Sequence, residues 1–253
     1  MSQNQSPNPY TANPVAPRTA AGSPAAGASP SALGVKPDAR LAAAFLSQAF
    51  LWMFAGLLVT AGVAWAVQSN ERLLEFAAGN FLLLFIAQLI IVVAISAGIK
   101  RINATAALAL FFVYAASLGV TIGLIVSSYT TGSVVIAFVS ASAMFGAAGV
   151  YGATTKRSLA GLRGILFMGL IGLMVAMVLN LIFPSTAVNL LISIVGVVIF
   201  TALTAYDVQR IQSGDLAAAT GSMEKAAVIG ALQLYLDFIN IFLFMLRLLG
   251  GRS

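Results

Sequence analysis

The sequence contains no cysteine and no histidine, and each absence excludes a class of chemistry. Without cysteine the chain can form neither disulfides nor thiolate sites. Without histidine it lacks the usual ligand of zinc sites and the base of Ser-His catalysis. Histidine is also the usual sensor of pH near neutrality. Any pH response of this protein would therefore have to come from its carboxylates.

Charge is scarce as well. Only 8% of the residues are charged, whereas 60% are hydrophobic, and the mean hydropathy is +0.99. Globular domains are about 25% charged and about 45–50% apolar, so these values indicate an integral membrane protein. The net charge of +6 comes from lysines and arginines scattered between apolar runs. Because they form no patch, we expect no nucleic-acid partner.

Residues 1–36 are rich in Pro, Ala, Ser, Asn and Gly and have almost no large apolar side chains. This composition predicts a disordered tail, and the lack of an apolar core is unlike a signal peptide. A solvated leader is the simpler interpretation, and a protein-binding role stays open. Asp38 can cap the helix that follows, so the transmembrane domain is expected over residues 37–253.

Apolar runs of about 20 residues, the length that a bilayer requires, follow the tail. They are too long and too unalternating for barrel strands, and lipid leaves irregular backbone without hydrogen-bond partners. The predicted fold class is an all-α membrane protein with short turns between its helices, two of them over 68–80 and 212–224. The seven expected spans are 43–67, 79–99, 104–127, 132–154, 161–183, 188–211 and 227–249.

The positive charges predict the orientation of these spans. If the N-terminus is cytoplasmic, ten lysines and arginines lie inside and three, Arg72, Arg247 and Arg252, lie outside. This is the bias expected of cytoplasmic loops, so we expect the N-terminus inside and the C-terminus outside. The ten inside residues are Arg18, Lys36, Arg40, Lys100, Arg101, Lys156, Arg157, Arg163, Arg210 and Lys225.

Glycines are spaced for close helix contact in two of the spans. Gly119 and Gly123 form a GxxxG pair, and Gly146, Gly149 and Gly152 follow one another in the next span. Such glycines usually let helices approach closely. Packing is the interpretation we favour, and backbone lining a pore is the alternative.

Two of the seven acidic residues, Asp207 and Asp237, lie at membrane depth, where a charge costs at least a few kcal/mol. The other five are most simply solvated charges in turns or near helix ends: Asp38, Glu71, Glu75, Asp215 and Glu224.

Each deep aspartate belongs to a polar stripe on its helix. Gln233, Asp237 and Asn240 share one side of the apolar stretch 231–250. On the preceding span, Thr201, Thr204 and Asp207 recur every third residue. These stripes must face protein or water rather than lipid. Because the two helices are antiparallel neighbours, the aspartates can meet if the earlier helix continues past Arg210.

Two carboxyl groups that meet at this depth cannot both ionise easily, since each is desolvated and each repels the other. They would titrate as a pair that shares one proton, which is a pH-responsive latch without histidine. The charged pair would also attract a cation. Calcium takes six to eight oxygens, so we expect transient passage near Asp207 and Asp237 rather than a firm metal site. The alternative is a satisfied polar cluster that only orders two helices.

Arg101 is a third candidate, at the end of the second span beside Lys100. Its side chain could simply reach the membrane interface. It could instead be a counter-ion that pairs with one aspartate and is displaced when the pair changes protonation.

Two motifs carry a family resemblance. The segments Thr204-Ala-Tyr-Asp-Val-Gln209 and Leu234-Tyr-Leu-Asp-Phe-Ile-Asn240, with the Leu-rich end after them, resemble the Bax inhibitor-1 family of membrane proteins. The layout of seven spans also matches, so the likeness covers about residues 40–250 of a bacterial-type member.

The resemblance implies a seven-helix bundle in which the other six helices surround a central last helix, and a pH-sensitive calcium leak. It places the paired aspartates of the family on Asp207 and Asp237 and the arginine that pairs with them on Arg101. Some bacterial members have a glutamate in the second helix, where Gln88 is the nearest polar residue here. The family also includes proteins that restrain membrane proteases or cell death by binding partners.

Several functions are therefore compared. The first is a passive cation pathway of the plasma (inner) membrane, gated by the aspartates, with no cofactor. The second is a regulatory protein that binds membrane partners. A proton-coupled transporter would need inverted repeats, which the sequence does not display. An intramembrane protease is least favoured, because Asp237 lacks Gly-x-Gly-Asp surroundings and Asp207 follows the bulky Tyr206, so we expect no enzyme.

Overall fold

Long helices make up nearly all of the structure, a computed structural model that describes residues 39–251, with side chains from residue 43. The predicted tail, 1–36, and the predicted cap, Asp38, lie outside the described residues. Within them the helices are α1 (Ala39–Gln68), α2 (Glu71–Gly79), α3 (Phe81–Gly98), α4 (Ala104–Val126), α5 (Thr131–Thr154), α6 (Leu162–Ile182), α7 (Thr186–Gln212), α8 (Asp215–Thr220) and α9 (Met223–Leu249).

Seven of these helices, all except α2 and α8, are long and apolar enough to cross a membrane. Their bounds lie within a few residues of the predicted spans, so the all-α, seven-span fold class is confirmed. Polar residues cap several of them by accepting hydrogen bonds from free N–H groups of the first turn. Asn103, Thr130, Ser185 and Ser222 do so at the starts of α4, α5, α7 and α9.

The two short helices lie where turns were predicted. In α2 the Asn70 side chain accepts from the backbone N–H groups of Arg72 and Leu73 at 3.0 and 3.3 Å, which starts a helix in a segment too short to span. α8 is flanked by Gly214 and Gly221, with φ of 78° and 80°, a left-handed conformation that glycine adopts readily. Caps and glycines, rather than apolar length, explain both helices.

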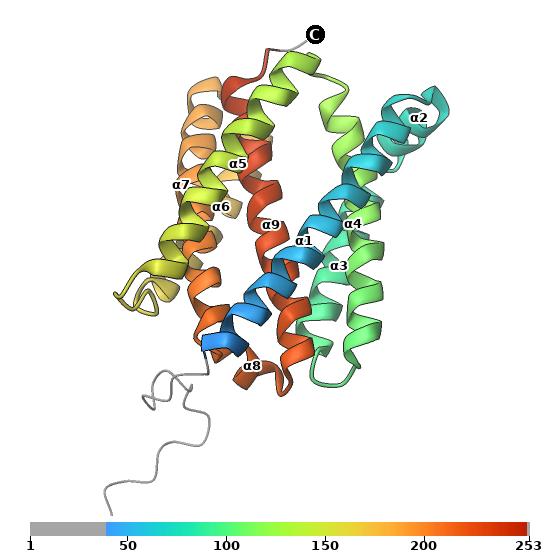
Figure 1. The fold of residues 1–253 in the computed structure, drawn as a ribbon. Coiled ribbons are helices and arrows are strands. Elements are labelled where there is room, and N and C mark those ends of the chain that lie inside the picture. Colours follow the sequence, from blue (N-terminus) through green and yellow to red (C-terminus); the bar gives the residue numbers. More distant parts are fainter. Residues whose placement is uncertain (1–38, 252–253) are drawn as a thin grey trace, which may run out of the picture.

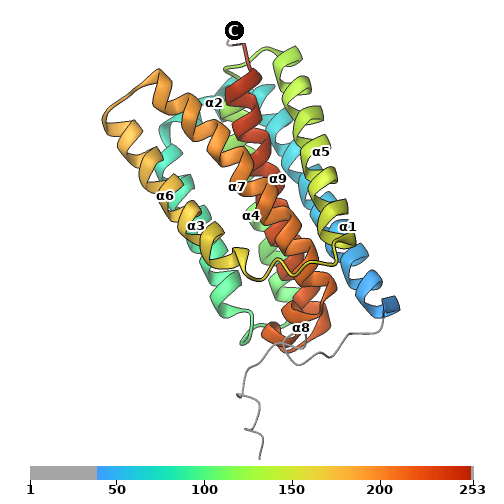
Figure 2. The ribbon, with the colours of Figure 1, turned by 90° about the vertical axis from the view of Figure 1, so that its left-hand side faces the viewer.

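α9 is the centre of the bundle (Figure 1). In its most apolar 18-residue window 72% of the residues are buried, against 11% in those of α3 and α6. α1, α4, α5 and α7 pack directly against α9, while α3 packs on α4 and α6 on α7 (Figure 2). The central position of the last helix is confirmed, but four long helices rather than six form its immediate surroundings.

Glycines bring the helix backbones together, as the GxxxG spacing predicted. A Cβ added to Gly119 or Gly123 would lie 2.8 Å from the Thr60 carbonyl oxygen or 2.9 Å from that of Ala64, so only glycine allows α4 to approach α1 this closely. Gly152 on α5 is even closer to the backbone of Ala205 on α7. By contrast, Gly146 has open space around it.

The described cations are distributed unevenly between the two ends of the bundle. The end that carries α8 also holds the α3–α4 and α5–α6 connections, and the described C-terminal residues lie at the opposite end (Figure 1). Among the cations whose side chains the structure describes, only Arg72 and Arg247 lie toward the opposite end. The distribution agrees with the positive-inside pattern, and the cytoplasmic location of the α8 end stays a prediction. The cations of the α8 end are Lys100, Arg101, Lys156, Arg157, Arg163, Arg210 and Lys225.

Candidate functional site

Asp207 and Asp237 face each other in the interior, from α7 and α9. Their side chains are 7% and 4% exposed, and the two helices are packed neighbours. α7 continues to Gln212, past Arg210, which was the condition for the two carboxyl groups to meet. The carboxyl group of Asp237 interacts electrostatically with that of Asp207. We call these two residues the aspartate pair.

Hydrogen bonding around the aspartate pair is incomplete. Among the described residues, no group donates a hydrogen bond to Asp237 Oδ2, which is fully buried. The Thr204 hydroxyl lies between two acceptors: it donates to the Phe200 carbonyl oxygen at 2.8 Å and also interacts with the Asp237 carboxyl group. A hydroxyl has one proton, so it can serve only one acceptor at a time. The pair therefore has less support than buried carboxyl groups normally receive.

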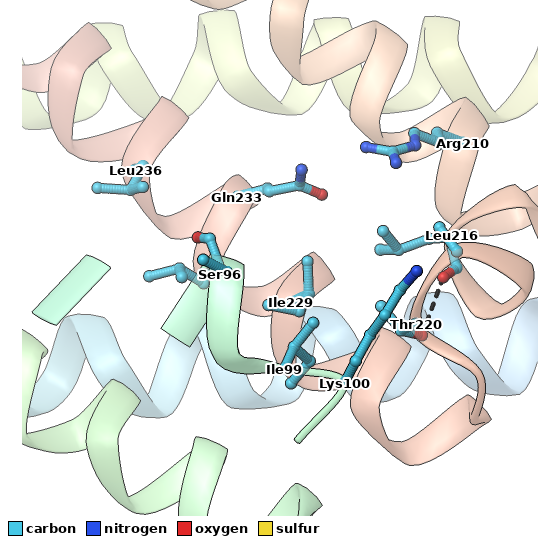
Figure 3. A pocket seen from close by; sticks show the side chains of 12 residues that line it. Ser96, Ile99, Lys100, Arg210, Leu216, Thr220, Ile229, Gln233 and Leu236 are labelled. Atoms are coloured by element: carbon cyan, nitrogen blue, oxygen red, sulfur yellow. Dashed lines mark hydrogen bonds between the residues drawn. The ribbon is translucent and has the colours of Figure 1, made fainter. Parts of the chain in front are cut away.

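The rest of the two predicted stripes does not gather around the pair. Asn240 donates to the Leu236 carbonyl oxygen at 2.8 Å, within its own helix. Gln233 is half-buried and points into a pocket beside Arg210 (Figure 3). The Oε1 atom of Gln233 and the hydroxyl of Thr201 are buried and have no hydrogen-bond partner among the described residues. The side chains of the two stripes therefore lie in different surroundings, and only part of each stripe lies at the aspartate pair.

Two arginines are placed differently from each other. Arg101 lies in the exposed turn after α3. Arg210, half-buried on α7, interacts electrostatically with Asp207. Sequence reasoning counted Arg210 only as an inside loop charge. The signal that could have found it is its spacing of three residues from Asp207, which puts both side chains on one side of a helix.

A second buried polar cluster, also missed from the sequence, lies on the other side of α9. The hydroxyl groups of Thr60 and Tyr235 are 2.6 Å apart, and Thr60 Oγ1 lies 3.0 Å from the Gly56 carbonyl oxygen and 2.9 Å from that of Ala115. We call this group the Thr60–Tyr235 cluster. It ties α1, α4 and α9 together through buried hydroxyl groups, both with partners.

Gln88, the polar residue of α3, is buried and donates to the Ser117 carbonyl oxygen at 3.0 Å and to Thr121 Oγ1 at 2.8 Å. Both partners belong to α4. The amide therefore joins α3 to α4, and its hydrogen bonds do not involve the aspartate pair.

The fold and site define a multi-pass helical membrane protein with two carboxyl groups buried beside its central helix. More specifically, the chain belongs to the Bax inhibitor-1 family, because the family model described as "Inhibitor of apoptosis-promoting Bax1" matches residues 42–253. The resemblance seen in the two sequence motifs is confirmed.

Bacterial relatives support the same assignment. The chain is 41% identical to the inner membrane protein YbhL of Escherichia coli (strain K12) over 224 residues, which cover 86% of this chain and 95% of that protein. It is 42% identical to an uncharacterized protein of Borreliella burgdorferi, over 82% of this chain and 92% of the relative. The uncharacterized protein YrjE of Lactococcus lactis is 41% identical, with 82% and 90% covered.

Proposed function

We propose that the protein is a pH-sensitive calcium leak pathway of the inner membrane, gated by the aspartate pair. The observation that carries the proposal is the burial of two interacting carboxyl groups on adjacent helices, one of them with an oxygen atom that no described residue satisfies. Ionisable groups inside a membrane span are rare and are usually functional. With histidine absent, carboxyl groups are the natural titrating groups.

The proposed gate works through one shared proton. While the proton is shared, the two carboxyl groups can form a hydrogen bond that holds α7 against α9. When the pH rises and the proton leaves, the two negative charges repel each other and attract a cation. Calcium, a hard cation with oxygen ligands, would then pass without being stored. Flux is therefore expected to increase with pH.

A counter-ion would complete this gate. The family resemblance assigns that role to Arg101, and the interaction with Asp207 supports Arg210. We propose that Arg210 stabilises the ionised Asp207 from the α8 end, where most of the described cations lie. We also propose that this end is cytoplasmic, by the positive-inside rule. The printed name of the relative YbhL, an inner membrane protein, supports the inner membrane as the membrane that holds the chain.

The test is calcium flux into proteoliposomes between about pH 5 and 8, the range in which a near-neutral switch would act. The parent protein is expected to conduct more as the pH rises. Asp207→Asn and Asp237→Asn should each abolish that pH dependence, because neither variant retains a titrating pair. Glu224→Gln, which removes an exposed acid outside the pair, is the matched control and should behave like the parent. If both aspartate variants follow the parent profile throughout, the gate proposal is wrong.

A further inference from the structure

A pocket lies at the α8 end of the bundle, beside the aspartate pair but separate from it. Its volume is about 280 Å³, and its walls come from the last turn of α3, the end of α7, α8 and the first half of α9. This volume is close to the lower limit of small-molecule sites, which is about 300 Å³. The pocket can therefore hold a small ligand or the head of a larger one.

Two charged residues line the pocket, and both are cations. Lys100, after α3, and Arg210, on α7, extend toward the pocket from different sides, and the Gln233 amide points toward Arg210 from α9 (Figure 3). No carboxylate is among the described lining residues. Lys225 adds a third cation nearby, since its Nζ donates to the Lys100 carbonyl oxygen at 3.4 Å. A cation would be repelled from such a pocket, whereas an anion would be attracted.

The other residues that line the pocket indicate which kind of anion it would accept. Lys100 and Arg210 are located where α3 and α7 end, near the level of the membrane interface. Leu232 and Leu236 form an apolar wall farther along α9, and Leu236 is roughly 20 Å from the start of that helix at a rise of about 1.5 Å per residue. The pocket thus has a cationic mouth and a mainly apolar depth, in which Ser96 and Gln233 are the polar residues. This polarity matches an anionic headgroup that carries an acyl chain.

We propose that this pocket binds a phosphate group, held between Lys100 and Arg210. Arginine forms paired hydrogen bonds with phosphate oxygens, and lysine contributes a compact charge. Gln233 is suited to a hydroxyl group next to the phosphate, because its buried Oε1 has no donor among the described residues. The apolar wall favours a membrane phospholipid as the source, and free phosphate would meet the same two cations. The site does not depend on the proposed leak, since binding is measured without flux.

Binding to the purified full chain in neutral detergent tests the proposal, by native mass spectrometry and thermal shift. Three probes separate the sources: dioleoyl phosphatidylglycerol, dioleoylglycerol with the same chains and no phosphate, and inorganic phosphate. The parent should bind the phospholipid and not dioleoylglycerol. Lys100→Gln and Arg210→Gln should each weaken that binding about tenfold, the effect of losing one charge-assisted hydrogen bond.

Two further variants control for general charge and for folding. Lys156→Gln removes an exposed cation at the same end of the bundle, outside the pocket, and should bind like the parent. Arg210→Lys retains the positive charge but loses the paired hydrogen bonds, so its affinity should lie between those of the parent and Arg210→Gln, and it serves as the second variant if Arg210→Gln folds poorly. Binding of inorganic phosphate alone, with the same dependence on Lys100, would support the site and identify free phosphate as its ligand. Equal binding of dioleoylglycerol, unchanged binding by Lys100→Gln, or no binding of either phosphate probe would overturn the proposal.

Discussion

The central helix has two buried polar clusters whose hydrogen bonding differs. Tyr235 and Asp237 are two residues apart, or about 200° around α9, so their side chains point to different sides. On one side, the Thr60–Tyr235 cluster has partners for both of its hydroxyl groups, at 2.6 to 3.0 Å. On the other side, the aspartate pair leaves Asp237 Oδ2 without a donor among the described residues.

This difference in hydrogen bonding assigns a different role to each cluster. A satisfied buried cluster stabilises and orders the helices that it joins. A buried carboxyl group that lacks a hydrogen-bond partner destabilises the fold, because the cost of removing it from water is not fully compensated. The fold thus depends on one side of α9, while the other side is available for a change in protonation. Three substitutions test this division, from the largest expected effect on stability to the smallest.

The largest effect is expected at the contact between α5 and α7, which belongs to neither polar cluster and sets the scale for the other two substitutions. Gly152 on α5 is so close to the Ala205 backbone on α7 that a side chain cannot fit without moving a helix. Gly152→Leu should lower the free energy of unfolding by about 3 kcal/mol or more, as strong overpacking does. Gly146→Leu, on the same helix but in open space, is the control. Unfolding in mixed micelles of increasing denaturing detergent measures both, and similar curves for the two variants would refute the packing argument.

A smaller loss of stability is expected at the Thr60–Tyr235 cluster. Thr60→Val keeps the shape of the side chain but leaves the buried Tyr235 hydroxyl without its partner, at a cost of about 2 kcal/mol. Thr60→Ser retains the hydroxyl and should cost clearly less. In proteoliposomes, Thr60→Val should keep the pH profile of the parent, because it leaves the aspartate pair intact. A changed profile would mean that the two clusters are not independent.

How far the sequence predicted this arrangement depends on the kind of interaction. Apolar length alone located the seven spans, since lipid imposes the same requirement on every spanning helix. The spacing of Gly119 and Gly123 predicted a close contact, which α1 and α4 make. The two short helices were not predicted, because caps and left-handed glycines, rather than apolar periodicity, determine them.

The polar interior was predicted only where a charge made it conspicuous. Asp207 and Asp237 were singled out because carboxylates are rare in apolar spans. Thr60 and Tyr235 were not singled out. They are partners of each other but are 175 residues apart in the sequence, and neither residue type is unusual in a membrane helix. Arg210 was overlooked because a cation near a helix end has a simpler explanation until its neighbour on the helix is considered. Long-range pairing of ordinary residues leaves little trace in one sequence.

The smallest effect on stability is expected at the aspartate pair itself. Asp237→Asn keeps the shape of the side chain and removes a buried group that lacks full compensation, so the free energy of unfolding should change by less than about 1 kcal/mol, or rise. The micelle assay used for Gly152→Leu and Thr60→Val measures it on the same scale. A loss as large as that of Thr60→Val would mean that the carboxyl group is a structural element that orders α7 and α9. An unchanged or higher stability, together with a lost pH response, would mean that the membrane interior keeps this carboxyl group for its proton and not for the fold.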